Sequence, residues 1–199
     1  MKKIVVLNGI HGSGKSTLGK RVTEKDSRFK YFGEIGEQVY TEVHYKNLRS
    51  YEAYDSEIFR REIARDAKLL ETPEIPVVET WHIENLAYAS VRSPQLRDYF
   101  KQMFERQLHF FDPVVVFISI DWDTFRERSK KGNNNHQMDT LVAFTERVQS
   151  QLLEIYDEYG IRPLQVRNEG RVEDTVTELY EGLVMRGLTE DKVSGKEQL

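Results

Sequence analysis

Short apolar runs alternate along this chain with longer stretches in which apolar and charged residues recur at helical spacing. Apolar runs of about four to eight residues are typical of buried strands, and the longer amphipathic stretches are typical of helices. The predicted strands are residues 4–8, 29–32, 75–79, 114–120 and 164–166. The predicted helices are residues 15–25, 51–71, 95–111, 123–131, 138–159 and 171–186. This alternation predicts an α/β domain in which crossover helices connect the strands of a parallel sheet.

Two of these segments allow sharper predictions. Residues 114–120 are almost all β-branched or aromatic, so this strand should lie inside the sheet with both faces buried. In the segment 51–71, the side chains expected to face the core are Ile58, Ile63, Ala64, Ala67 and Leu70. We expect residues 1–187 to form one domain and the polar residues 188–199 to form a frayed C-terminal tail.

The composition of the chain limits the classes of function that it can have. Its 199 residues are enough for one well-packed α/β domain. A net charge of −4 gives no electrostatic reason to expect nucleic acid or an anionic membrane as a partner. The absence of cysteine excludes disulfides, thiolate metal sites and a cysteine nucleophile. No apolar run approaches the ~20 residues that span a bilayer, and residues 1–3 lead directly into the first strand, so we expect a cytoplasmic protein.

The motif between the first predicted strand and the first predicted helix carries the strongest chemical signal. Residues 9–16 read Gly-Ile-His-Gly-Ser-Gly-Lys-Ser and match the phosphate-binding pattern G-x-x-x-x-G-K-[ST] at every fixed position. Backbone N–H groups in such a loop form an anion site, while Lys15 supplies a cation for the β- and γ-phosphates. The Ser16 hydroxyl is placed to bind Mg²⁺. The loop residues expected to bind ATP are Gly9, His11, Gly12, Ser13, Gly14, Lys15, Ser16 and Thr17.

Three further segments share an order along the chain with one known family. Residues 77–88 combine a strand ending in an acid with a Leu-Ala-Tyr helix start, and residues 116–131 combine a strand with an arginine-bearing segment. Residues 144–148 read Phe-Thr-Glu-Arg-Val, and this segment is similar to the penultimate helix of that family. With the phosphate-binding loop, these segments resemble thymidylate kinases and the related deoxynucleoside kinases. The resemblance implies a three-layer α/β/α sandwich around a five-stranded parallel sheet, a small lid at about residues 126–140, and ATP and Mg²⁺ as cofactors.

The end of the third predicted strand both matches the family and departs from it. Glu79 falls where the family has an acid, which implies that Glu79 holds Mg²⁺ or acts as a base toward the acceptor. Thr80 falls where the family has an arginine that contacts phosphate or positions the acceptor, and threonine supplies no such charge. The candidate replacements, which the sequence does not rank, are Arg60, Arg61, Arg65 and Arg92.

Acidic and basic residues elsewhere match other parts of the family site. Glu34 and Glu37 follow the second predicted strand, so Glu34 is expected to contact the acceptor or act as a base; alternatively, both are solvated loop residues. A carboxylate base helps a neutral hydroxyl more than an anionic phosphate, which favours a nucleoside or another hydroxyl compound as acceptor. Arg126 and Arg128 are the candidates in the lid, and Arg128, which matches the family better, is expected to contact ATP and stabilise the transferring phosphoryl group.

Aromatic side chains near these segments could stack on the base of an acceptor. We expect Trp81 and Tyr88 to line the acceptor pocket. Tyr40, Tyr45 and Tyr51 occur at positions that are more often part of the core.

The leading hypothesis is ATP-dependent phosphoryl transfer to a nucleoside, a nucleotide or a similar small molecule, in which the catalytic residues are Lys15, Arg128, Glu34 and Glu79. An alternative is a P-loop ATPase or NTP-binding switch that acts through a partner, for which Asp121 offers an acid after an apolar strand. A non-catalytic binding module is the third class. The sequence does not name the acceptor, and it leaves open whether the chain forms a homodimer, as members of the family often do.

Overall fold

Strand β1 (Lys2–Asn8) lies at the centre of a five-stranded sheet in the order β2-β3-β1-β4-β5. The computed structural model describes residues 1–43, 50–130 and 135–188 of the chain. Every neighbouring pair of strands is parallel. The other strands are β2 (Phe29–Phe32), β3 (Ile75–Glu79), β4 (Phe111–Ser119) and β5 (Leu164–Arg167). All five predicted strands are therefore present, with small differences at their ends.

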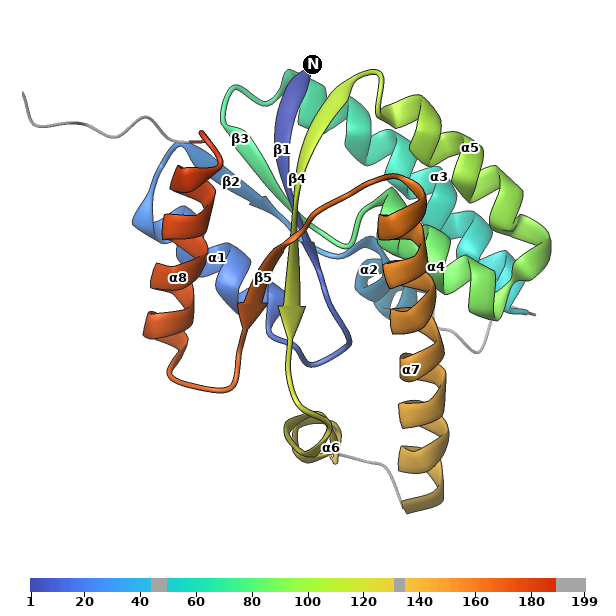
Figure 1. Cartoon of the computed structure of the whole chain (residues 1–199). Helices are drawn as coiled ribbons and strands as arrows, with labels where there is room; N and C mark the ends of the chain where they lie inside the picture. The colour runs from blue at the N-terminus through green and yellow to red at the C-terminus, as the bar shows by residue number, and fades with distance from the viewer. Residues whose placement is uncertain (44–49, 131–134, 189–199) are drawn as a thin grey trace, which may run out of the picture.

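Helices cover both faces of the sheet, as Figure 1 shows. They are α1 (Lys15–Lys25), α2 (Ile35–Val43), α3 (Tyr51–Glu71), α4 (His82–Arg92), α5 (Arg97–Gln107), α6 (Trp122–Ser129), α7 (Asn135–Glu158) and α8 (Val172–Met185), with a 3₁₀ turn η2 (Pro94–Leu96). Side chains alternate along a strand, so Ile4 and Val6 pack against α3, α4, α5 and α7, whereas Val5 and Leu7 pack against α1 and α8. The result is the predicted three-layer α/β/α sandwich.

The position of β4 confirms the prediction made from its apolar sequence. It lies between β1 and β5. Val115 and Phe117 belong to the apolar cluster on one face of the sheet, and Val116 and Ile118 belong to the cluster on the other face. Burial on both faces explains why this strand lacks the polar alternation of a half-exposed strand.

The prediction of one helix over residues 95–111 is wrong at its C-terminal end. Helix α5 ends at Gln107, and β4 begins at Phe111, which pairs with Lys2 of β1. The Lys2 amide also donates a hydrogen bond of 2.8 Å to the Phe110 carbonyl. These residues continue the apolar spacing of the helix, but they pair with the sheet instead of extending α5. The sequence analysis also missed α2 and placed the start of α4 too late, at Leu86 rather than His82.

The buried face of α3 differs from the predicted face. Ile58 is buried as expected, but Ile63 and Leu70 are 42% and 45% exposed, and Ala64 and Ala67 are exposed as well. The helix instead buries four charged residues, which are Asp55, Glu62, Arg65 and Asp66. Charged groups remain inside a protein when they are paired and hydrogen-bonded, and pairing of that kind cannot be seen in a hydrophobic period.

Parts of three predictions lie outside the described residues. These are the middle of the lid at residues 131–134, Tyr45, and the tail from residue 189 onward. Among the helices that the structure describes, none combines the length and the apolar character needed to cross a membrane.

Candidate active site

The phosphate-binding loop connects β1 to α1 and requires glycine where it passes close to other segments. Gly9 has a φ of 148° and Gly14 a φ of 96°, both in the region that favours glycine. A Cβ atom at Gly9 would lie 2.3 Å from the carbonyl oxygen of Ile118, and one at Gly14 would lie 2.3 Å from the side-chain nitrogen of Asn168. The loop therefore packs directly against the carboxyl ends of β4 and β5.

Two side chains from the second half of the chain fasten this loop. Buried Asn168, just after β5, donates from Nδ2 to the Ser13 carbonyl at 2.7 Å. Arg128 of α6 donates to the Gly12 carbonyl at 2.9 Å and to the Asn168 carbonyl at 3.1 Å. Arg128 thus lies at the loop that is expected to hold ATP. The sequence analysis missed Asn168, because an isolated asparagine after a short strand carries no motif.

Lys15 begins α1 and is almost fully buried. Its ammonium group donates to the Gly9 carbonyl at 2.6 Å and lies 3.7 Å from the Glu84 carboxylate. Burial alone would lower the pKa of Lys15, but the carboxylates of Glu84, Glu34 and Glu79 raise it overall. The Lys15 side chain is therefore charged, and it is held next to the loop by its own backbone and by acids.

A cleft of about 650 Å³ opens at the carboxyl end of the sheet. Its lining consists of His11, Gly12, Ser13, Gly14, Lys15, Ser16, Thr17, Glu34, Gly36, Glu37, Tyr40, Thr41, Tyr54 and Glu79. Apart from Gly9, which precedes it, the predicted ATP-binding residues of the loop all line this cleft, together with Glu34 and Glu79. The structure thus brings the predicted residues of the loop, Glu79 and Glu34 to one cavity, and Glu37, which is exposed on α2, also lines it.

Ser16 and Glu79, the predicted Mg²⁺ ligands, are in direct contact. The Ser16 hydroxyl donates to Oε1 of Glu79 at 2.8 Å, and the Tyr31 hydroxyl donates to Oε2 of the same carboxylate. Burial and the bond to Glu79 raise the pKa of Tyr31, which keeps its proton available for that hydrogen bond. Hydroxyl and carboxylate oxygens are hard ligands that suit Mg²⁺, so this pair fits the ion that the fold implies. Tyr31 was not predicted as a site residue.

Glu34 lines the cleft together with the loop. Its Oε1 is 3.0 Å from the position that a Cβ atom on Gly36 would take, so the small residue at 36 makes room for the carboxylate. Burial raises the pKa of Glu34; the Lys15 charge opposes this rise, and the Glu79 and Glu37 carboxylates add to it. Glu34 is therefore an acid whose proton affinity depends on which charges enter the cleft.

Glu84 is the acid that the sequence analysis missed. It lies in the first turn of α4, is 2% exposed, and has one carboxylate oxygen, Oε2, without a hydrogen-bond partner. Burial raises its pKa to about 7; Lys15 opposes the rise, and the Glu34 and Glu79 carboxylates add to it. A group that titrates near neutral pH beside the loop lysine is a candidate functional residue. Its signal in the sequence was an acid five residues after Glu79.

The four arginines considered as replacements for the missing family arginine have different positions. Arg65 is buried and donates to the carbonyls of Glu79 and Thr80 at 3.2 and 2.8 Å. Arg92 is 15% exposed, forms a bidentate pair with Asp55, and stacks on Tyr54 and Tyr88. The other two, Arg60 and Arg61, pair with Glu57 on the surface of α3. Arg65 thus contacts the end of β3, at the position where the family has its arginine. Its guanidinium group, however, donates to backbone carbonyls.

Thr80 needs such an anchor because its φ is 49°, a left-handed conformation that is uncommon for threonine. The charge on Arg65 is balanced by bidentate contact with Glu62 at 2.6 and 2.8 Å. The segment between β3 and α4, which positions Glu79 and Glu84, is therefore held in a strained conformation by a buried ion pair from α3.

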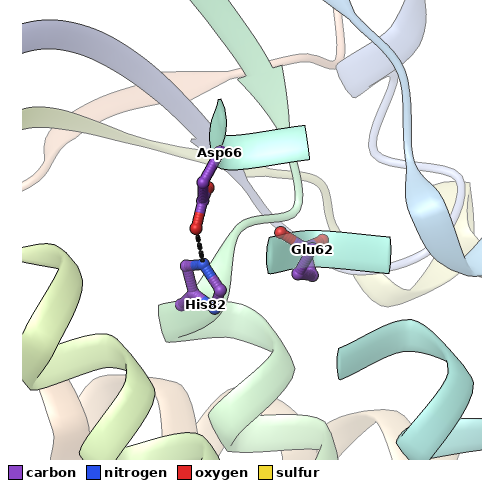
Figure 2. Close-up of side chains that lie close together, drawn as sticks. All are labelled: Glu62, Asp66 and His82. Carbon is purple, nitrogen blue, oxygen red and sulfur yellow. Dashed lines mark hydrogen bonds and ion pairs between the residues drawn. The ribbon is translucent and has the colours of Figure 1, made fainter. Parts of the chain in front are cut away.

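Figure 2 shows the rest of this buried network, in which α3 supplies Glu62 and Asp66 and the start of α4 supplies His82. Asp66 lies 2.6 Å from Nε2 of His82 and accepts a hydrogen bond of 3.0 Å from the Trp81 indole. Glu62 also accepts from the Asn85 amide at 3.0 Å. Three potential metal ligands converge here, but both carboxylates already accept hydrogen bonds from protein donors. The network therefore joins α3 to the start of α4.

The prediction that Trp81 lines the acceptor pocket is wrong. Its side chain is fully buried, packs edge-on against Phe104 and Phe111, and is absent from the lining of the cleft. The large indole is accommodated in the core because its N–H group finds Asp66. Tyr88 is half-buried between Arg92 and Phe144, outside the lining of the cleft, and its role as a substrate contact stays a prediction.

Two of the aromatic residues expected in the core lie at the surface instead. Tyr40 is 59% exposed and lines the cleft, and Tyr51 is 52% exposed. Arg126, the second lid candidate, lies 3.6 Å from Asp123 of its own helix and is not part of the lining. The aromatic wall of the cleft is therefore built from α2 and α3, through Tyr40 and Tyr54, and not from the segment after β3.

Comparison with known proteins places this architecture in a class. No family model matches the sequence, and no curated protein matches it. Among solved structures, the chain is similar to thymidylate kinase from Candida albicans, with 15% identity, a TM-score of 0.69, and coverage of 95% of this chain and 94% of that chain. The fold is thus that of the P-loop nucleotide-kinase-like α/β proteins.

Two further solved structures support the same fold. Deoxyadenosine kinase from M. mycoides has 18% identity and a TM-score of 0.60, and the match covers 92% of this chain and 99% of that chain. Shikimate kinase from Aquifex aeolicus has 16% identity and a TM-score of 0.55, with 94% and 99% covered. The acceptors named for these proteins differ, so the fold by itself does not select an acceptor.

Proposed function

We propose that this protein transfers the γ-phosphoryl group of ATP to a hydroxyl group of a small molecule. The observation that carries the proposal is the cleft itself, whose lining combines Lys15, Ser16 and Glu79 with Glu34. A loop that holds phosphates, a pair of oxygen ligands for a metal, and a carboxylate facing them are the parts needed for direct phosphoryl transfer.

On the donor side, the loop and Lys15 hold the phosphates of ATP, and Ser16 and Glu79 would hold Mg²⁺. When bound, Mg²⁺ would offset the negative charge on the phosphate oxygens. Lys15 moves from the Gly9 carbonyl to the phosphates, because a phosphate is a stronger partner than a neutral carbonyl. Arg128 stays at the loop, where it supports the Gly12 carbonyl and adds positive charge near the phosphates.

On the acceptor side, the carboxylates favour a hydroxyl compound over a nucleotide. A hydroxyl group must lose its proton as it attacks phosphorus, and a positioned carboxylate can accept that proton. Glu34 is the proposed base, since it lines the same cleft as the loop; Glu84, which lies against Lys15, is the second candidate. A nucleotide acceptor would instead need cations for its own phosphate, and Thr80 leaves that position uncharged.

The alternative of an ATPase or NTP-binding switch has weaker support. Its candidate acid, Asp121, caps the N-terminus of α6 by accepting from the Thr124 amide at 2.7 Å, which gives it a structural role. Residues of α2 and α3 also line the cleft, and a cleft with such a lining suits a small acceptor better than a water molecule alone. We also expect the protein to act as one domain in the cytoplasm, without nucleic acid or membrane as partner; whether it forms a homodimer is left open.

The test is ADP formation with Mg²⁺, ATP and a panel of hydroxyl compounds, nucleosides and nucleotides. Acceptor-dependent ADP formation should appear, and Lys15→Ala should lower kcat/KM by about a hundredfold or more. Lys68→Ala, which removes an exposed lysine of α3, is the matched control and should leave activity unchanged. ATP binding without transfer to any acceptor in the panel, or ATP hydrolysis that only a macromolecule stimulates, would refute the kinase proposal.

A further inference from the structure

The acceptor half of the cleft is acidic and aromatic. Beyond the loop and the proposed metal ligand Glu79, the lining includes Glu34 and Glu37 with the rings of Tyr40 and Tyr54. ATP with one Mg²⁺ ion adds further negative charge at the loop. A second anion beside Glu34 and Glu37 would meet like charges from these acids and from ATP, at separations where such repulsion is costly.

The nearby cations that the structure describes already have partners. Lys15 is committed to the donor phosphates in the proposed function. The Arg92 guanidinium stacks on Tyr54 and forms an ion pair with the Asp55 carboxylate. The Ser93 hydroxyl also donates to the Asp55 carboxylate, at 2.5 Å. Arg65 is neutralised by Glu62 and turned toward the backbone. None of these three cations is therefore positioned to clamp a phosphate group on the acceptor.

Glu34 itself lacks a counter-charge at close range. It is half-buried and has no ion pair with a residue in the described parts of the chain, while Glu37 and Glu79 share the cavity with it. Its carboxylate is fixed above Gly36, whose carbonyl accepts a hydrogen bond of 2.8 Å from the Tyr54 hydroxyl. Behind Lys15, the buried Oε2 atom of Glu84 also has no hydrogen-bond partner. Burial raises the pKa of Glu34 because it disfavours the charged carboxylate, and a cation in the cavity would offset this effect.

We propose that the acceptor is a hydroxyl compound that also carries a protonated amine, an amino alcohol in the broad sense that includes aminosugars and aminonucleosides. The ammonium group lies against Glu37 and the exposed ring of Tyr40, where carboxylate pairing and cation–π contact act together; the Tyr54 ring already carries the Arg92 guanidinium. Glu34 lies between this group and the γ-phosphate. This inference rests on the proposed function and names its substrate class.

The transfer step follows from this placement. The hydroxyl oxygen attacks the γ-phosphorus, the bond from that phosphorus to the bridging β–γ oxygen breaks, and ADP leaves with the bond electrons. The hydroxyl proton passes to the Glu34 carboxylate and then to solvent. The products are a phosphate monoester of the amine and ADP, and the ammonium group is unchanged.

The experiment compares compounds that differ mainly in charge. The pairs are D-glucosamine with N-acetyl-D-glucosamine, ethanolamine with N-acetylethanolamine, and 3′-amino-3′-deoxyadenosine with adenosine, and adenosine 5′-monophosphate supplies an anion. Binding is measured by calorimetry with Mg²⁺ and a non-hydrolysable ATP analogue present, and transfer is measured by ADP formation with ATP. In at least one pair, the amine should bind roughly tenfold more tightly than its neutral partner.

The variants test whether the cleft causes this preference. Glu37→Gln should reduce the amine-to-neutral ratio at least threefold, whereas Glu42→Gln, on the same helix but outside the lining, should preserve it. Equal or tighter binding of the neutral compounds or of the monophosphate overturns the inference, as does failure of every amine to bind. Equal or faster transfer to the neutral hydroxyl compounds than to the amines would overturn it while leaving the kinase proposal intact. Amine preference in binding without any transfer would overturn the kinase proposal alone.

Discussion

Lys15 and Glu84 form a buried pair, with the ammonium nitrogen 3.7 Å from a carboxylate oxygen. The pair links the phosphate-binding loop to the first turn of α4, the helix that follows the strained segment at Thr80. The same ammonium group donates to the Gly9 carbonyl, which holds Lys15 at the base of the loop. Glu84 therefore affects both the stability of the fold and the charge that the donor site presents.

The first prediction concerns Glu84 and pH. Burial moves its pKa from 4.5 to about 7, so the folded state binds this proton more tightly than the unfolded state. Wild-type stability contributed by this group is therefore lost as pH rises from 4.5 to 7. Across that window, the free energy of unfolding of Glu84→Gln should rise by on the order of 3 kcal/mol relative to that of wild type.

Urea denaturation at both ends of this window measures the effect. Glu71→Gln, at the exposed end of α3, is the control and should follow the wild-type pH profile. Parallel profiles for wild type and Glu84→Gln would show that Glu84 titrates like a solvated acid.

The second prediction concerns Gly14. Gly14→Ala places a Cβ atom 2.3 Å from Asn168 Nδ2 at a residue with φ of 96°, which costs about 1–3 kcal/mol in backbone strain and disturbs the loop. ATP affinity, measured by calorimetry, should fall at least tenfold. Gly170→Ala is the control, since no heavy atom lies within 4 Å of the added carbon and φ is ordinary. Unchanged ATP affinity in Gly14→Ala would mean that the loop binds no phosphate in the described conformation.

The third prediction concerns the metal ligands. Glu79→Gln retains one oxygen that can accept from Ser16, and its NH₂ group can donate to the Tyr31 oxygen, so the fold should persist, but it removes the charge that would bind Mg²⁺. The Mg²⁺ concentration needed for half-maximal ADP formation should rise about tenfold. Thermal unfolding checks that the variant is folded, and Glu71→Gln again serves as the control. If the Mg²⁺ response of Glu79→Gln matches that of wild type, Glu79 does not hold the metal.

The fourth prediction concerns the ion pair beneath Thr80. Arg65→Met leaves Glu62 buried without its cation, which should destabilise the protein by about 3–5 kcal/mol. The double variant Arg65→Met/Glu62→Met should recover much of this loss, because two apolar side chains carry no desolvation cost. Arg61→Met, which breaks surface pairs only, should cost less than about 1 kcal/mol. Denaturant unfolding measures all three, and equal losses for Arg65→Met and Arg61→Met would exclude the buried role.

The sequence predicted those parts of the molecule that local patterns determine. The strands have apolar runs that are distinct from their surroundings, and the loop at residues 9–16 has fixed residues at fixed spacing. The alternation of strands and helices along the chain predicted a parallel sheet, because such a sheet requires crossover helices. Glu34 and Glu79 were placed near the site by the family resemblance, and the structure puts both in the cleft at the carboxyl end of the sheet.

Other features depend on contacts between distant segments and could not be predicted from local patterns. The buried face of α3 carries charges whose partners lie on α4 and β3, so a search for apolar residues selected exposed Ile63 and Leu70 instead. Trp81 resembled a stacking residue, but Asp66 satisfies its indole inside the core. Glu84 acquires its raised pKa from burial, and nothing in its neighbours along the chain indicates that burial.

The bond between Asn168 and Ser13 joins residues 155 positions apart in the chain. The loop is synthesised long before its partner, which follows β5. The loop therefore reaches its final geometry only after the last strand has paired with β4. During synthesis, the ability to bind a nucleotide should appear late and abruptly, so that bound nucleotide reports completion of the whole sheet.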